Sequence, residues 1–123
     1  MNRVVHFEIN VDDPERAVKF YTQVFGWTIN KWDNPEQDYW LVMTGDEKEP
    51  GINGGITKRM HPSATTINTI DVKSVDESIE KVKASGGEVV MPKTAILTVG
   101  YLAYCKDTEG NVFGMMQMDP NAK

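Results

Sequence analysis

The chain has 123 residues, a length that suits one compact domain and is too short for two independent ones. Hydrophobic residues make up 40% and charged residues 25%, the balance of an ordinary soluble globular protein. The formal net charge of -5 and the scattered basic residues argue against nucleic acid or an anionic membrane as a partner.

The location of the protein is predicted from what the sequence lacks. No apolar run approaches the ~20 residues that cross a bilayer, so we expect no membrane insertion. The N-terminal residues enter a strand pattern directly, without a secretory signal. Cys105 is the single cysteine, which excludes an intramolecular disulfide and a multi-cysteine zinc site. We therefore expect a cytoplasmic protein.

The first stretch of the chain predicts a strand. Apolar and polar residues alternate from position 4 to position 11, as in a strand with two unlike faces. The polar face carries His6, Glu8 and Asn10.

A helix follows this strand. Asp13 before Pro14 predicts an N-cap and a proline at the first helical position. An apolar stripe runs to Phe25, and Gly26 is placed to end the helix. Further strands are predicted at 27–32, 39–43, 52–58, 66–73, 88–91, 101–106 and 111–118, with a second helix at 75–85 and a loop at 92–99.

The pattern of the first half returns in the second half. An offset of 61 residues places Val72 on Val11, Ile70 on Ile9 and Gly87 on Gly26. Internal repetition of this kind fixes the architecture, here βαβββ twice. We interpret the chain as one domain made of module 1–59, linker 60–65, module 66–118 and tail 119–123.

Three segments carry a resemblance to a known family: HFEINVDDPERAVKFYTQVFGW, SVDESIEKVKASGGEVV and YLAYCKDTEGNVFGMMQ. The chain resembles the vicinal oxygen chelate superfamily, which includes glyoxalase I, bleomycin-resistance proteins and extradiol dioxygenases. The resemblance implies an α+β, glyoxalase-like fold, in which two βαβββ modules curl mixed sheets around a cavity. It also implies a homodimer, and leaves open whether modules pair within one chain or are swapped between two.

The resemblance further implies where a metal would bind, because metal-dependent members draw ligands from the first and fourth strands of each module. His6 is a matching donor, but its counterpart in the second module is Ile67. The last-strand position falls on Gly114, and its counterpart lies within 53–55, where only Asn53 offers an oxygen. One strong donor of four remains, so we expect no metal and no other cofactor.

A weaker metal alternative stays open, since His6, Glu8 and Asp71 could in principle meet an ion. Gly114 lacks the bulky side chain of a ligand, and we expect open space there. Trp40 is a candidate for stacking on a planar ligand. The predicted pocket comprises His6, Glu8, Asn10, Trp40, Ile67, Thr69, Asp71, Gly114 and Met116.

Three functions follow from these predictions. The first is a metal-free protein of the glyoxalase/bleomycin-resistance kind that binds a small apolar or amphipathic molecule. The second is a glyoxalase-like lyase or isomerase that uses His6 and Glu8 as acid and base, with a weak or absent divalent metal. The third is a non-catalytic interaction subunit.

Two other residues have plainer expected roles. Cys105 is expected to be a buried structural thiol, and His61 an exposed linker residue.

Overall fold

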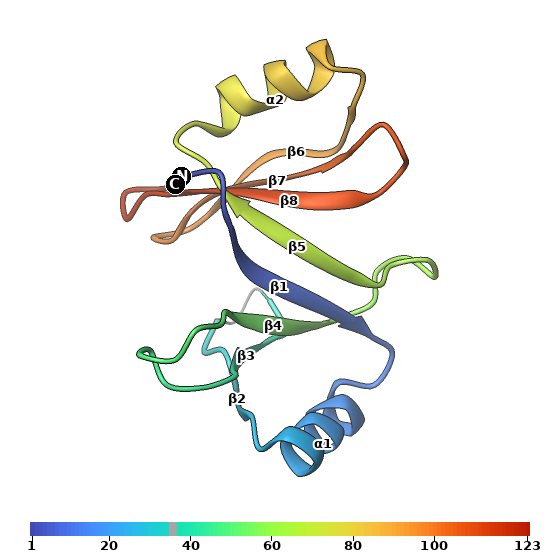
Figure 1. The fold of residues 1–123 in the computed structure, drawn as a ribbon, viewed down its shortest axis with the longest axis vertical. Coiled ribbons are helices and arrows are strands. Elements are labelled where there is room, and N and C mark those ends of the chain that lie inside the picture. Colours follow the sequence, from blue (N-terminus) through green and yellow to red (C-terminus); the bar gives the residue numbers. More distant parts are fainter. Residues whose placement is uncertain (35–36) are drawn as a thin grey trace. The chain divides into compact units, whose positions relative to one another are not determined.

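The computed structural model describes residues 1–34 and 37–123 (Figure 1). The first repeat contains β1 (Val4–Val11), α1 (Pro14–Phe25), β2 (Thr28–Lys31), β3 (Tyr39–Met43) and β4 (Asn53–Lys58). The second contains β5 (Thr66–Asp71), α2 (Val75–Ala84), β6 (Glu88–Ile96), β7 (Gly100–Lys106) and β8 (Val112–Met118). The element order is βαβββ twice and the sheets are mixed, which confirms the predicted α+β fold class.

Contacts divide the chain into two compact units. Residues 6–67 form one, called here the N-terminal unit. Residues 1–5 and 68–123 form the other, the C-terminal unit. The division into a single domain with two modules, a linker and a tail remains an interpretation of the repeat. Among the described residues, neither helix has the length and apolar content needed to cross a membrane.

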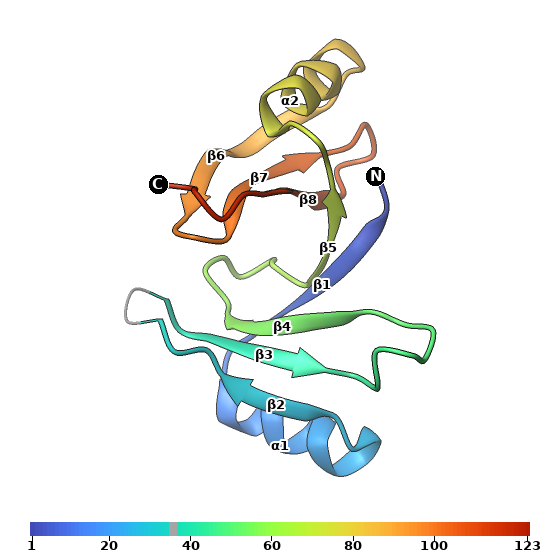
Figure 2. The same ribbon diagram turned by 90° about the vertical axis from the view of Figure 1, so that its left-hand side faces the viewer.

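The N-terminal unit is built on strands in the order β2-β3-β4-β1. Figure 2 shows β2, β3 and β4 side by side, with α1 next to β2. β1 runs parallel to β4, while the other neighbours are antiparallel. Val42 and Ile56 are buried on the face of this sheet that α1 covers.

Local capping defines the ends of α1. The Asp13 side chain accepts a hydrogen bond from the backbone N–H of Arg16 at 3.2 Å, and Pro14 begins the helix. Gly26 adopts a left-handed conformation with φ +72°, which a residue with a side chain rarely tolerates. None of the residues of α1 is buried, and Val24 and Phe25 are 54% and 60% exposed. The apolar stripe of α1 is therefore only half covered.

The C-terminal unit has strands in the order β5-β8-β7-β6, with β5 parallel to β8. Figure 1 shows α2 lying beside β6, β7 and β8. The Ser74 hydroxyl caps α2 by accepting a hydrogen bond from the N–H of Glu77 at 3.2 Å. The core between helix and sheet consists of Val72, Val75, Ala103, Cys105 and Met115. This core includes Cys105, as predicted.

One predicted loop is wrong. Strand β6 continues from Glu88 to Ile96, through most of the segment 92–99. Its pairing with β7 shifts register on both sides of Met91. Such irregularities absorb Pro92, which has no N–H to donate, and β6 is an edge strand, where proline is tolerated.

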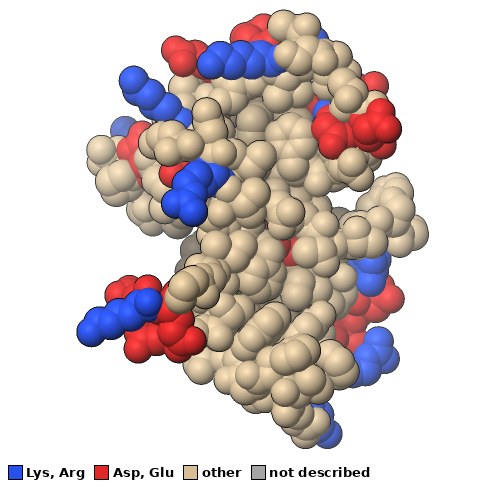
Figure 3. Space-filling view, viewed as in Figure 1, with Lys and Arg blue, Asp and Glu red and all other residues tan. Residues whose placement is uncertain are grey.

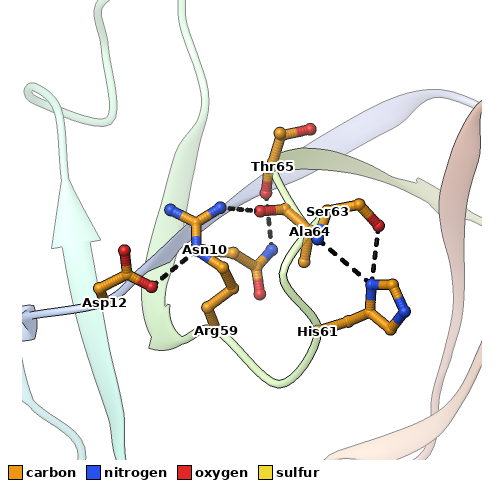
Figure 4. A network of polar contacts seen from close by, with 7 residues as sticks. All are labelled: Asn10, Asp12, Arg59, His61, Ser63, Ala64 and Thr65. Carbon is orange, nitrogen blue, oxygen red and sulfur yellow. Dashed lines mark hydrogen bonds and ion pairs between the residues drawn. The ribbon is translucent and has the colours of Figure 1, made fainter.

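The linker is tied to the end of β1 by the polar contacts drawn in Figure 4. The Arg59 guanidinium donates to Asp12 at 3.0 Å and to the Ala64 carbonyl. His61 is exposed, as predicted, and its Nδ1 accepts a hydrogen bond from the N–H of Ser63 at 3.2 Å. These contacts give His61 a local structural partner.

Candidate functional site

Strand pairing defines the face of the N-terminal sheet that carries His6. His6 lies opposite Asn53 on β4, and Glu8 lies opposite Gly55. Gly55 in turn lies opposite Leu41 on β3. Since side chains alternate along each strand, these residues share one face, and α1 covers the other.

A hydrogen bond joins His6 to Tyr39 on this face. His6 Nε2 lies 2.7 Å from the Tyr39 hydroxyl oxygen, and the two rings are nearly parallel at 15°. Tyr39 is buried, with 7% of its surface exposed. Burial lowers the pKa of the His6 imidazole below its ordinary value, which keeps the ring neutral near pH 7. A neutral ring has one donor and one acceptor nitrogen, so the tautomer decides which partner donates.

Tyr39 reaches His6 by crossing β4 at Gly55. A Cβ atom placed on Gly55 would lie 2.0 Å from the Tyr39 hydroxyl oxygen and 2.1 Å from Cζ. Any larger residue at position 55 would collide with the ring. The structure explains why two glycines stand together on β4: Gly54 faces Phe7 and Gly55 faces Tyr39.

Aromatic and apolar groups lie on the same side of the sheet as the His6–Tyr39 pair. The Trp32 ring meets the Tyr39 ring edge-on, with ring centres 6.2 Å apart. On the same face of β3, Leu41 is 42% exposed and Met43 is 49% exposed. The face thus combines one partly buried polar pair with accessible apolar side chains.

Two asparagines near this face make hydrogen bonds of their own. The Asn10 amide donates to the Thr65 carbonyl at 2.7 Å, so it contacts the linker (Figure 4). The Asn53 side-chain oxygen accepts a hydrogen bond from the N–H of Thr44 at 2.9 Å. Each is held by a neighbouring loop.

Trp40 lies on the opposite face of β3 from Tyr39, beside α1. It lines a groove of about 380 Å³ together with residues of α1. The other lining residues are Glu15, Val18, Lys19, Thr22 and Gln23. The structure therefore does not bring Trp40 to His6.

In the C-terminal unit, strand pairing joins the remaining residues of the predicted pocket in pairs. Thr69 lies opposite Gly114, and Asp71 lies opposite Met116. The expected open space at Gly114 is wrong: a Cβ there would lie 3.1 Å from the Thr69 hydroxyl and 3.3 Å from the Tyr104 ring. Ile67, the first-strand counterpart of His6, is half-buried on β5 and is the last residue of the N-terminal unit.

Comparison with known proteins identifies the family. Residues 3–115 match the family model of the Glyoxalase/Bleomycin resistance protein/Dioxygenase superfamily. The chain belongs to this superfamily. This membership confirms the resemblance drawn from the sequence.

Named relatives in the superfamily include lactoylglutathione lyases. The chain is 31% identical to the lactoylglutathione lyase of Haemophilus influenzae over 88% of its own length and 87% of that protein. It is 27% identical to a probable lactoylglutathione lyase of Vibrio cholerae, covering 94% of this chain and 91% of the relative. It is 28% identical to the Arabidopsis thaliana enzyme GLX1, but spans only 45% of that longer protein.

Solved structures agree on the fold. A methylmalonyl-CoA epimerase variant of Streptomyces coelicolor, in complex with 2-nitronate-propionyl-CoA, superposes with a TM-score of 0.72 at 13% identity, over 100% of this chain and 99% of that one. A superfamily member from Vibrio splendidus gives 0.66 at 15% identity, with 95% and 99% covered. At these identities the likeness concerns the fold alone.

Membership of the superfamily raises the question whether these residues could hold a divalent metal. Within either unit, as far as residues 1–34 and 37–123 show, no three His, Cys, Asp or Glu side chains form a group that could hold an ion. On the His6 face, the fourth-strand position is Gly55, whose side-chain space Tyr39 occupies. Hard and borderline cations need several converging N or O donors. The donor set of this face does not fit a superfamily-type metal centre.

Sequence reasoning found His6 but missed Tyr39, Trp32 and Gly55 as its neighbours. The alternation of β3 contained one usable signal, because it places Tyr39 and Trp40 on opposite faces. Which of the two shares a face with His6 depends on the pairing of β3 with β4 and of β4 with β1. That information is not local in the sequence.

Proposed function

We propose that the protein binds a small apolar or amphipathic molecule on the His6 face of the N-terminal unit, without a bound metal. One observation carries the proposal: Leu41, 42% exposed, lies opposite Gly55, beside the partly buried His6–Tyr39 hydrogen bond. An exposed apolar surface next to a few fixed polar groups is the usual composition of a small-molecule site. The ligand's apolar part would contact Leu41 and Met43.

Tryptophan fluorescence tests this proposal. Trp32 lies against Tyr39, while Trp27 stacks on Tyr21 of α1 at 5.0 Å. Titration with the amphipathic dye anilinonaphthalene sulfonate and with a panel of uncharged aromatic compounds should give saturable quenching. The W32F variant should lose most of the signal, and W27F should keep it. Quenching that W27F abolishes and W32F retains would place the ligand elsewhere.

A matched substitution locates the ligand independently of fluorescence. Leu41→Asp adds a charge to the proposed contact surface, whereas Leu97→Asp adds one at another exposed leucine, 54% exposed. Binding measured by calorimetry should weaken at least about tenfold, or 1.4 kcal/mol, in L41D and remain within a factor of two in L97D. Equal losses in both variants would contradict binding at the His6 face.

A second candidate is a glyoxalase-like lyase or isomerase that uses His6 and Glu8 as acid and base. The neutral state of the buried His6 ring favours it, because a neutral imidazole near pH 7 can accept a proton. The lactoylglutathione lyases among the relatives suggest the test compound. Formation or breakdown of lactoylglutathione should be assayed in the wild type and in His6→Ala, with and without added Zn²⁺ or Ni²⁺. Turnover that His6→Ala abolishes would favour the enzymatic function. An inactive wild type would favour the metal-free binding function.

We also propose that two copies associate as a homodimer. The exposed apolar side chains of α1 support this: Phe20 and Val24 are each 54% exposed and Phe25 is 60% exposed. Figure 3 shows a mostly uncharged surface at the lower end of the molecule, where Figure 1 places α1. Light scattering should report a dimer for the wild type and a monomer for Val24→Asp. Gln23→Asp, which adds the same charge at a polar position, should remain dimeric.

A further inference from the structure

We propose that Tyr39, lying over Gly55, is the residue that makes the His6 face unable to bind a divalent cation and leaves it to organic ligands. The proposal deepens the function proposed above and rests on it. It concerns a residue that the sequence did not single out, and a position whose role only strand pairing defines.

Strand pairing identifies equivalent glycines in the two repeats. Gly55 lies opposite Glu8 of β1, and Gly114 lies opposite Thr69 of β5. Glu8 and Thr69 correspond at the 61-residue offset of the repeat. The two glycines are therefore the same fourth-strand position, the one where metal-dependent members of the superfamily are expected to carry a ligand.

A tyrosine from the third strand lies against the side-chain space at both positions, and at Gly55 it fills that space. At Gly114, a Cβ atom would lie 3.1 Å from the Thr69 hydroxyl oxygen and 3.3 Å from the nearest atom of the Tyr104 ring, which is a tight contact. At Gly55, the exclusion is complete, because three Tyr39 atoms lie within 2.0–2.2 Å of the Cβ position. A carboxylate cannot be added at position 55 while Tyr39 stays in place.

Tyr39 also occupies the donor atom that an ion would need. His6 Nε2 is hydrogen-bonded to the Tyr39 hydroxyl at 2.7 Å, so an ion bound at this nitrogen would have to displace a buried phenol. The remaining oxygen expected on β4, that of Asn53, already accepts the Thr44 N–H at 2.9 Å. Steric exclusion and hydrogen bonding thus act through one side chain, and its removal should reverse both.

The test restores the missing donor in one unit and uses the other as control. Y39A/G55E frees His6 Nε2 and adds a carboxylate on the same face. Y104A/G114E makes the same two changes around Gly114, where the first-strand counterpart is Ile67 and no imidazole is available. Zn²⁺ and Ni²⁺ binding is measured by calorimetry on the full chain. We expect at least about tenfold tighter binding in Y39A/G55E, since even outer partners of metal ligands change affinity by 10–100-fold. We expect no gain in Y104A/G114E.

Two outcomes would overturn the proposal. One is equal Zn²⁺ binding by the two double variants, with both folded by circular dichroism. The other is stoichiometric Zn²⁺ binding by the wild type that His6→Ala abolishes, a comparison that needs no double variant. If Y39A/G55E is unfolded, Y39L/G55D repeats the test with a smaller loss of volume. The dye titration of the wild type tests the proposed ligand binding, and the metal calorimetry tests the role of Tyr39. Each proposal can therefore fail without the other.

Discussion

The Tyr39 hydroxyl lies 2.7 Å from Nε2 of His6, and its ring crosses the strand between them at Gly55. The Tyr39 side chain therefore has three structural effects. It satisfies a partly buried imidazole, it fills the space of an absent side chain, and it holds the start of β3 across β4.

The hydrogen bond to His6 should contribute measurably to stability. Tyr39→Phe keeps the ring over Gly55 and removes only the hydroxyl, leaving His6 Nε2 without its partner. We expect the free energy of unfolding in urea to fall by about 1 kcal/mol, the usual net value of such a bond. Tyr21→Phe is the control, because its ring stacks on Trp27 in the same unit and the hydroxyl plays no part in that contact. A loss as large in Y21F as in Y39F would contradict this account.

The close approach at position 55 should make that glycine more sensitive to substitution than Gly114 or Gly45. Gly55→Ala places a methyl group 2.0 Å from the Tyr39 hydroxyl oxygen, and overpacking of this kind costs about 1–3 kcal/mol or more. Gly114→Ala meets Thr69 at 3.1 Å and should cost less. At Gly45, whose nearest neighbours are Glu49 side-chain atoms at 3.7 Å, alanine should change stability by less than about 0.5 kcal/mol. Thermal unfolding should rank the three variants in this order.

The elements that the sequence predicted well are those fixed by local chemistry. Asp13 caps α1 where it was expected, because a cap depends on residues within one turn. Strands β1 and β3 have the predicted bounds, since both show an uninterrupted pattern. The segment after Pro92 was missed because its strand is defined by pairing with β7, which a local proline signal outweighed.

The candidate site was predicted only to the extent that its residues lie on one strand. His6 was found from the alternation of β1 and from the superfamily resemblance. Tyr39 was not, since its contact with His6 spans 33 residues of sequence and depends on a glycine in a third strand. Gly114 was found but given the wrong consequence, because the sequence does not show that Thr69 and Tyr104 lie close to its Cβ position.

The burial of His6 should appear in the pH dependence of stability. Its pKa is lowered in the folded protein, whereas in the unfolded chain it is about 6.5. Below pH 6.5 the unfolded chain therefore binds more protons at His6 than the folded protein, so stability falls as the pH decreases. Above about pH 7.5 both states are neutral and the effect vanishes. In urea unfolding between pH 8 and pH 5, the stability advantage of the wild type over His6→Gln should shrink toward low pH. Parallel profiles would show that His6 is not desolvated.

Cys105 should behave as a core residue without thiol chemistry in the native protein. It is fully buried among Val72, Val75, Ala103 and Met115, and burial raises the pKa of its thiol. Because the thiolate is the reactive form, dithionitrobenzoate should react slowly in buffer and rapidly in urea. Cys105→Ala should lower the free energy of unfolding by about 1–2 kcal/mol through the cavity it leaves, and Cys105→Ser should lower it further by burying a hydroxyl. Fast reaction of the native thiol, or a serine variant as stable as the alanine variant, would contradict burial in this core.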